Sequence, residues 1–171
     1  MGQDNKLRTV NDRPVISRLA NRCLLFIVTC GFMGYLPGAP GTYASFFGCI
    51  IIYLFPFSTM SGNLFFVCAF AVCSIICINF LKYDGEDPSY IVIDELAGMF
   101  IAMAGHKPTL LNIISGFILF RIFDIIKPYP IRRIERLKRG YGVVADDVLA
   151  GLFANCFIWL GYLALRIFTA V

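Results

Sequence analysis

Residues 23–81 read CLLFIVTCGFMGYLPGAPGTYASFFGCIIIYLFPFSTMSGNLFFVCAFAVCSIICINFL, a run of 59 residues without Asp, Glu, Lys, Arg or His. A water-soluble fold of this size has no room to bury such a run, whereas one helix that crosses a bilayer needs only about 20 apolar residues. The whole chain shows the same bias, because 58% of its 171 residues are hydrophobic and 15% are charged. The composition therefore excludes an intrinsically disordered chain and predicts a single membrane domain over 1–171.

The apolar segments along the chain predict an all-α membrane bundle. The first segment has only 13 residues and would be about 20 Å long as a helix, whereas the hydrocarbon core of a bilayer is about 30 Å thick. It ends at a run of Pro and Gly that breaks helices, so we expect an interfacial or re-entrant helix there. The other five are expected to cross, the two shortest only with flanking residues or local thinning of the bilayer. The segments are 24–36, 43–57, 63–81, 91–105, 110–126 and 148–169.

Basic residues gather beside apolar segments, as they do on the cytoplasmic side of membrane proteins. Positions 1–22 hold five basic and two acidic residues, and positions 127–139 hold six basic residues and Glu135. These clusters favour anionic lipid as a partner rather than nucleic acid, and no obligate protein partner is indicated. With a flexible basic N-terminus (about 1–20) inside the cell, five crossings leave the C-terminus outside. The stretch 131–139, which is apolar at every third residue, predicts an amphipathic helix on the membrane surface.

Five carboxylates from three separated segments are predicted to meet near the cytoplasmic face. Two lie within 91–105, one follows Arg121 by one helical turn, and two precede 148–169. Carboxylates inside a membrane are costly and are candidates for function by default. Structural alternatives exist, because acidic residues stabilise a helix N-terminus and an Arg–Asp pair neutralises itself. The five candidate catalytic residues and metal ligands are Asp94, Glu95, Asp124, Asp146 and Asp147.

The ligand atoms of this set indicate the cation and the chemistry. Oxygen ligands alone suit Mg²⁺, or Mn²⁺ as a substitute, rather than zinc, and the only histidine, His106, is predicted at the opposite face. Carboxylate-bound Mg²⁺ beside arginine and lysine suits phosphate chemistry. The Pro/Gly loop at residues 37–42 offers backbone N–H groups at a helix start, where anions bind, and Thr42 could be the N-cap. A simple break between two helices would explain the loop equally well. The candidate phosphate-binding residues are Arg121, Lys127, Gly41, Thr42, Ser45 and Arg132.

Four motifs carry a resemblance to a known family. They are PGT at 40–42, VIDELAGM at 92–99, FRIFDIIKPYPIR at 120–132 and GVVADDVLAG at 142–151. In order and spacing, over about residues 30–156, they resemble the bacterial phosphatidylglycerophosphatase A family, whose loop usually reads Pro-Gly-Thr-x-Gly-Ser; here Ala44 stands at the second glycine. The resemblance implies an all-α, Mg²⁺-dependent enzyme of the bacterial inner membrane. It also implies that the enzyme removes the terminal phosphate of phosphatidylglycerophosphate, giving phosphatidylglycerol and inorganic phosphate.

Two other functions fit parts of the pattern. A CDP-alcohol-type phosphotransferase would also use carboxylate-bound Mg²⁺, but Asp84-Gly85 is not followed by the Ala-Arg that such enzymes carry. A small ion transporter would use intramembrane carboxylates and a broken helix, but it needs access from both sides of the membrane. For a phosphatase, the absence of Cys-x5-Arg and of a second histidine favours attack by water assisted by the metal, with a covalent intermediate on a carboxylate as the open alternative.

Overall fold

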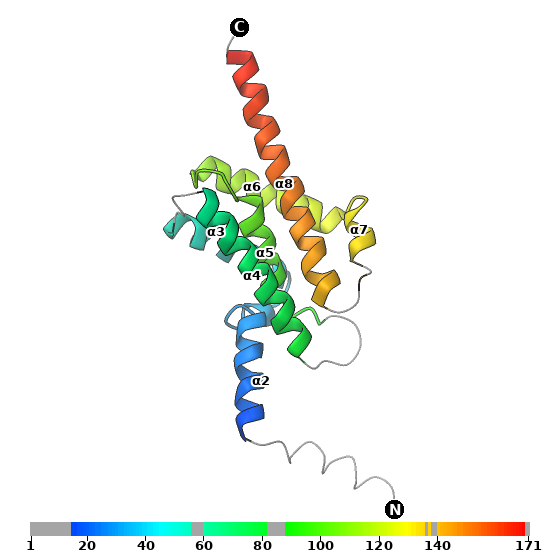
Figure 1. Cartoon of the computed structure of the whole chain (residues 1–171). Helices are drawn as coiled ribbons and strands as arrows, with labels where there is room; N and C mark the ends of the chain where they lie inside the picture. Colours follow the sequence, from blue (N-terminus) through cyan, green and yellow to red (C-terminus); the bar gives the residue numbers. More distant parts are fainter. Residues whose placement is uncertain (1–14, 56–59, 82–87, 136, 138–139, 170–171) are drawn as a thin grey trace, which may run out of the picture.

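Every regular element in the described part of the chain is a helix (Figure 1). The structure is a computed structural model that describes residues 15–55, 60–81, 88–135, 137 and 140–169. The predicted all-α fold is confirmed. The elements are α2 (Val15–Val28), the 3₁₀ turn η1 (Met33–Tyr35), α3 (Pro40–Leu54), α4 (Met60–Phe80), α5 (Ile93–Ala102), α6 (Leu110–Ile126), α7 (Ile131–Ile134) and α8 (Gly140–Thr169).

Helix α5 forms the centre of the bundle. Nine of its ten residues are buried, and it packs against α3, α4, α6 and α8. Phe100 of α5 meets Phe70 of α4 edge-on, with ring centroids 5.2 Å apart, and Met99 is fully buried. A helix whose apolar residues cover all its sides has to be buried by neighbouring helices. Helix α2 and the C-terminal half of α8 project from the bundle in opposite directions (Figure 1).

Two glycines bring α5 and α8 into backbone contact. A Cβ atom on Gly98 would lie 2.5 Å from the Phe120 ring and 2.9 Å from the Asp147 carbonyl oxygen, and a Cβ on Gly151 would collide with the Gly98 carbonyl. Small residues allow this close approach between helices in a membrane. Phe120 and the α8 backbone fill the space beside Gly98. Each glycine follows an acidic residue by one turn, so the same contact places the acidic ends of α5 and α8 side by side.

Replacing Gly98 by alanine should destabilise the protein by about 1–3 kcal/mol, the usual cost of overpacking a filled core. The added methyl group would collide with a carbonyl of the α8 backbone, which cannot rotate away as a side chain could. Gly161→Ala is the matched control, because a Cβ there meets no atom within 4 Å. Thermal unfolding in detergent should show a lower Tm for the first variant only; equal Tm values would contradict the close approach.

The far end of α5 is capped by α8. The side-chain amide of Asn155 donates hydrogen bonds of 2.7–3.1 Å to the carbonyls of Ile101, Ala102 and Ala104. His106 lies beyond this cap, buried against the Trp159 ring with the ring centroids 4.9 Å apart. Trp159 follows Asp147 by twelve residues on one helix, a rise of about 18 Å. The only histidine therefore lies away from the carboxylates, and its predicted place at the opposite face of the membrane stays a prediction.

The predicted N-terminal helix has the wrong boundaries. It is expected over 24–36, but α2 runs from Val15 to Val28. The chain then turns through positive φ angles at residues 30–32, and the Thr29 hydroxyl accepts a hydrogen bond from the Phe32 N–H at 3.0 Å. Of the basic stretch 1–20, residues 15–20 belong to α2, and the rest lies outside the described residues.

Two boundaries near the C-terminus are also wrong. The amphipathic helix expected over 131–139 is instead the single turn α7, which ends at Ile134. Ile131 is fully buried, whereas Leu137 is mostly exposed. The last helix begins at Gly140 rather than at 148. Its first turns contain glycine and aspartate, which favour loops by propensity, but Gly140 packs directly on Ile78 of α4. Tertiary packing therefore extends α8 by two turns.

The outer surface of the bundle is strongly apolar. Large apolar side chains on α2, α3, α4, α6 and α8 are mostly exposed, among them Phe65, Leu111, Ile125 and Phe168, whereas soluble monomers rarely expose extended apolar patches. Within the described residues, α8 is the one helix that is both long and apolar enough to cross a membrane. Helix α5 has ten residues and rises only about 15 Å. The structure therefore supports a membrane protein, and the five predicted crossings stay a proposal.

Candidate active site

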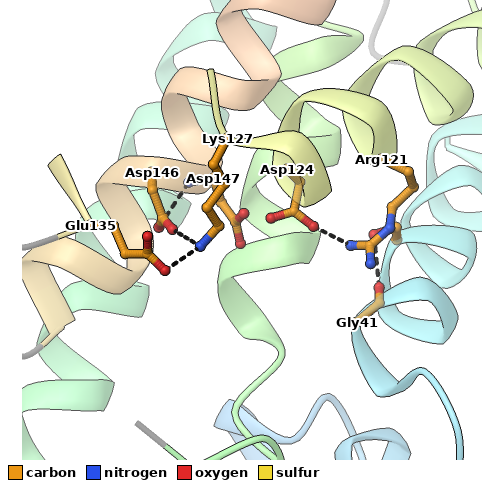
Figure 2. Close-up of polar contacts among 8 residues, drawn as sticks. Gly41, Arg121, Asp124, Lys127, Glu135, Asp146 and Asp147 are labelled. Atoms are coloured by element: carbon orange, nitrogen blue, oxygen red, sulfur yellow. Dashed lines mark hydrogen bonds and ion pairs between the residues drawn. The ribbon is translucent and has the colours of Figure 1, made fainter. Parts of the chain in front are cut away.

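All six carboxylates in the described part of the chain line one cavity of about 160 Å³. They come from the starts of α5 and α8, the end of α6 and the turn after α7, and Figure 2 shows four of them converging. The convergence predicted for five carboxylates from three separated segments is confirmed. We call this cavity the acidic cavity. Its lining residues are Asp94, Glu95, Asp124, Lys127, Glu135, Val143, Asp146 and Asp147.

Three of these carboxylates could hold a metal ion together. Asp94, Glu95 and Asp147 each offer one oxygen, and these oxygens all lie within 4.8 Å of one another. Asp94 Oδ1 and Glu95 Oε2 are buried and accept no hydrogen bond from the described residues, and a buried charge without a partner costs several kcal/mol. Oxygen ligands alone suit a hard cation. The residues present therefore fit Mg²⁺ or Mn²⁺.

The local backbone explains why two acidic residues are tolerated here. Asp94 and Glu95 occupy the first turn of α5, where the positive end of the helix dipole favours negative charge. Gly41, near the start of α3, contacts the Glu95 carboxylate so closely that a Cβ atom would collide with it. The Pro/Gly loop therefore meets the acidic cluster, and a larger residue at position 41 would have to displace the Glu95 carboxylate.

Arg121 pairs with the fourth carboxylate and keeps one donor free. Its Nη1 donates to Asp124 Oδ2 at 2.6 Å, one turn along α6 (Figure 2). Both side chains are largely buried, with 16% and 14% of their surface exposed. The Arg121 Nε is buried and has no hydrogen-bond partner among the described residues. A bound phosphate would accept a hydrogen bond from this Nε, and a bound cation would neutralise the carboxylate oxygens that lack partners among the described residues.

Lys127 bridges two further carboxylates at the edge of the cavity. Its Nζ lies 2.6 Å from Asp146 Oδ2 and 2.7 Å from Glu135 Oε1 (Figure 2). Burial acts to lower the pKa of Lys127, but the hydrogen bonds to the two carboxylates outweigh it and raise the pKa above the usual value for lysine. Lys127 is therefore cationic at any physiological pH. It caps α6 in the left-handed conformation with a φ of 46°, which is unfavourable for a residue other than glycine.

Two predictions about helix starts near the site are wrong. Thr42 is not the N-cap of α3, because the helix begins at Pro40 with Ala39 as its N-cap. The Ser45 hydroxyl is buried and donates to the Gly41 carbonyl at 2.8 Å, and its role in phosphate binding stays a prediction. Asp146 and Asp147 do not begin a helix but lie in the second turn of α8; the simple role of capping a helix start is therefore excluded for them.

Arg132 and Glu135 also lie elsewhere than the sequence indicates. Arg132 does not line the acidic cavity but lines a neighbouring one, which also contains Lys127. Glu135, which the sequence reading did not propose for the site, lines the acidic cavity. The feature of the sequence that could have indicated Glu135 as a site residue is its position as the only acidic residue within the basic stretch 127–139.

The helical bundle and its acidic cavity with flanking cations are features of an α-helical phosphatase. The family model of phosphatidylglycerophosphatase A matches residues 26–162, and the chain belongs to this family. The family makes the protein an enzyme, a phosphatase of phospholipid synthesis.

Three relatives from bacteria illustrate the similarity. A Bacteroides thetaiotaomicron protein, whose name proposes a phosphatidylinositol-3-phosphatase, is 38% identical over 138 residues, 75% of this chain and 87% of its own length. The phosphatidylglycerophosphatase A of Haemophilus influenzae is 35% identical over 138 residues, which cover 76% of this chain and 83% of its own. That of Escherichia coli K12 is 32% identical over 133 residues, 75% and 77% of the two chains. No solved structure matches the chain.

Proposed function

We propose that the protein hydrolyses the terminal phosphomonoester of phosphatidylglycerophosphate, giving phosphatidylglycerol and inorganic phosphate. One observation carries the proposal: every carboxylate in the described part of the chain lines a single cavity, beside Lys127 and the ion-paired Arg121. The name phosphatidylglycerophosphatase A of two relatives supports this lipid as the substrate. The family favours hydrolysis over the two alternatives, a phosphotransferase and an ion transporter.

The proposed cofactor is Mg²⁺, with Mn²⁺ as a substitute. The oxygens of Asp94, Glu95 and Asp147 would hold it, because they lie within 4.8 Å of one another and two of these residues have buried oxygens that find no partner among the described residues. When bound, a divalent cation supplies polarisation of the phosphoryl group and favours attack by water. Asp124 and Asp146 were predicted as ligands too; in the proposal their main role is to orient the two cations with which they pair.

The cations of the site would bind the phosphoryl group. Arg121 is held by Asp124, and its buried Nε, which has no partner among the described residues, could donate to a phosphoryl oxygen. Its planar guanidinium matches the geometry of a phosphate. Lys127, which lines the cavity, provides a positive point charge. Hydrogen-bond donors whose positions are fixed before the reaction stabilise the negative charge that develops in the transition state. The carboxylates offer acceptors for the proton that the attacking water loses.

A second lipid is a candidate substrate because of the Bacteroides relative. Phosphatidylinositol 3-phosphate and phosphatidylglycerophosphate share a phosphomonoester on a polyol, which a phosphodiester links to diacylglycerol. Release of inorganic phosphate from each lipid, in mixed micelles with Mg²⁺, distinguishes them. We expect the higher kcat/KM with phosphatidylglycerophosphate. A higher value with the inositol lipid would change the assigned substrate, and no release from either would contradict the proposed function.

The proposed location is the bacterial inner membrane, with several crossings and the acidic cavity facing the cytoplasm. Asp147 lies near the start of α8, and the apolar half of this helix projects away from the bundle (Figure 1). If α8 crosses the membrane, the C-terminus lies on the side opposite the cavity. A reporter fused to the C-terminus should therefore be periplasmic, and one fused to the N-terminus cytoplasmic. A cytoplasmic C-terminal reporter would contradict this topology.

A further inference from the structure

A second cavity adjoins the acidic one and is lined by cations instead of carboxylates. It has a volume of about 730 Å³ and lies along the end of α6, the following turn and α7. Lys127 lines both cavities, so the two are direct neighbours. The residues that line this basic cavity are Ile126, Lys127, Pro128, Tyr129, Arg132 and Arg133.

The charges of the two cavities are segregated. The ammonium group of Lys127 is bound to Asp146 and Glu135 on the acidic side. Arg132 and Arg133 are exposed and form no ion pair within the described residues. Two guanidinium groups without partners, beside a cavity without a carboxylate, favour an anion. Because guanidinium groups bind phosphate oxygens in pairs, a phosphate group is the anion that this lining suits best.

We infer that the basic cavity binds the phosphodiester of the lipid substrate while the acidic cavity binds its phosphomonoester. This inference rests on the proposed function, because it needs a substrate with two phosphate groups. In phosphatidylglycerophosphate a single glycerol separates them, so a substrate whose monoester lies among the carboxylates must place its diester close by. The adjoining cavity, reached past Lys127, is where the structure offers free cations for it.

The remaining lining residues are consistent with a lipid at this position. Ile126 and Tyr129 are large and mostly exposed; Ile126 is the last residue of α6, and Tyr129 lies in the turn that leads to α7. Tyrosine is enriched where membrane meets water. A diester bound by Arg132 and Arg133 would therefore have its diacylglycerol directed toward an apolar surface. The cavity then selects lipids with an internal diester over phosphatidate, which carries a phosphomonoester directly on diacylglycerol.

The test compares two substrates with the same acyl chains. The double variant Arg132→Gln, Arg133→Gln is assayed on phosphatidylglycerophosphate and on phosphatidate, in micelles of a neutral detergent at fixed ionic strength. The ratio of the two kcat/KM values should fall about tenfold for each guanidinium lost, a factor that corresponds to about 1.4 kcal/mol. The loss should appear mainly in KM, because the diester does not react. Arg22→Gln, an exposed arginine on α2 outside both cavities, should leave the ratio unchanged.

A second measurement uses the product as an inhibitor of phosphatidate hydrolysis. Phosphatidylglycerol keeps the diester but lacks the monoester, so it should inhibit the wild type and inhibit the double variant much less. Equal losses on both substrates, with inhibition unchanged, would show that the arginines only attract anionic micelles and would overturn the inference. A wild type that hydrolyses phosphatidate as efficiently as phosphatidylglycerophosphate would overturn it as well. A wild type that hydrolyses neither lipid would instead contradict the proposed function.

Discussion

Replacement of Asp147 by asparagine is expected to lower kcat for phosphate release by more than about a hundredfold. Changing only the partners of metal ligands already costs about 10- to 100-fold in activity or affinity, so the loss of one ligand should cost more. Asp147 is the member of the three-carboxylate cluster that comes from α8, whereas the other two come from α5. Without its oxygen, a cation would be held by one helix alone.

The control for this variant is Glu135→Gln, because Glu135 lines the same cavity but has 48% of its side chain exposed and lies outside the cluster. We expect a loss of less than about tenfold, typical of an exposed ion pair. In EDTA, Asp147→Asn should be at least as stable as the wild type, because it removes a buried negative charge. Mg²⁺ should raise the Tm of the wild type only, since binding stabilises the folded state. An Asp147→Asn variant with nearly full kcat would exclude this residue from the site.

Arg121→Lys is expected to lower kcat by about a hundredfold, within the range found when a donor that stabilises the transition state is removed. Lysine keeps the positive charge but loses the planar fork, and with it the buried Nε that has no partner among the described residues. The measurement is kcat and KM on phosphatidylglycerophosphate micelles at saturating Mg²⁺. Because the transition state gains charge that the substrate lacks, the loss should appear in kcat more than in KM.

The alternative for Arg121 is a purely structural role as the ion-pair partner of Asp124. In that case Arg121→Lys would keep its kcat, since a lysine can still neutralise the carboxylate. The variant Asp124→Asn separates the two roles further. If Asp124 serves to orient the guanidinium, its loss should reduce kcat less than the loss of the guanidinium itself. A full kcat in Arg121→Lys would show that the fork does not act in catalysis.

The sequence predicted helix type well and helix ends unevenly. Helix α6 spans Leu110–Ile126, the residues predicted, because the Thr109 side chain caps its start and Lys127-Pro128 ends it. Helix α8 begins two turns earlier than predicted, at Gly140, since packing on α4 outweighs the local preference of glycine and aspartate for loops. Hydropathy locates the apolar part of a helix. It does not detect polar turns that are helical only because they pack against other parts of the fold.

The candidate site was predictable as a region and less so as a set of roles. Charge and turn positions sufficed to bring five carboxylates to one end of the bundle. They could not show which three share a site, because this depends on the backbone contact between Gly98 and Gly151. They also could not show that Asp146 pairs with Lys127, nineteen residues away. The Ser45 hydroxyl resembled a ligand-binding group in the sequence, but it donates to its own helix.

The central claim is that the acidic cavity holds a divalent cation and hydrolyses a lipid phosphomonoester. The most direct test is a titration of Mg²⁺ into metal-stripped, purified protein, with inorganic phosphate release from phosphatidylglycerophosphate as the readout. We predict no turnover without metal and a saturable rise with Mg²⁺. Asp94→Asn should shift this rise to much higher Mg²⁺ or abolish it, since Asp94 has a buried oxygen that lacks a partner within the described part of the chain. Full turnover in EDTA, or an Mg²⁺ dependence that Asp94→Asn leaves unchanged, would contradict the claim.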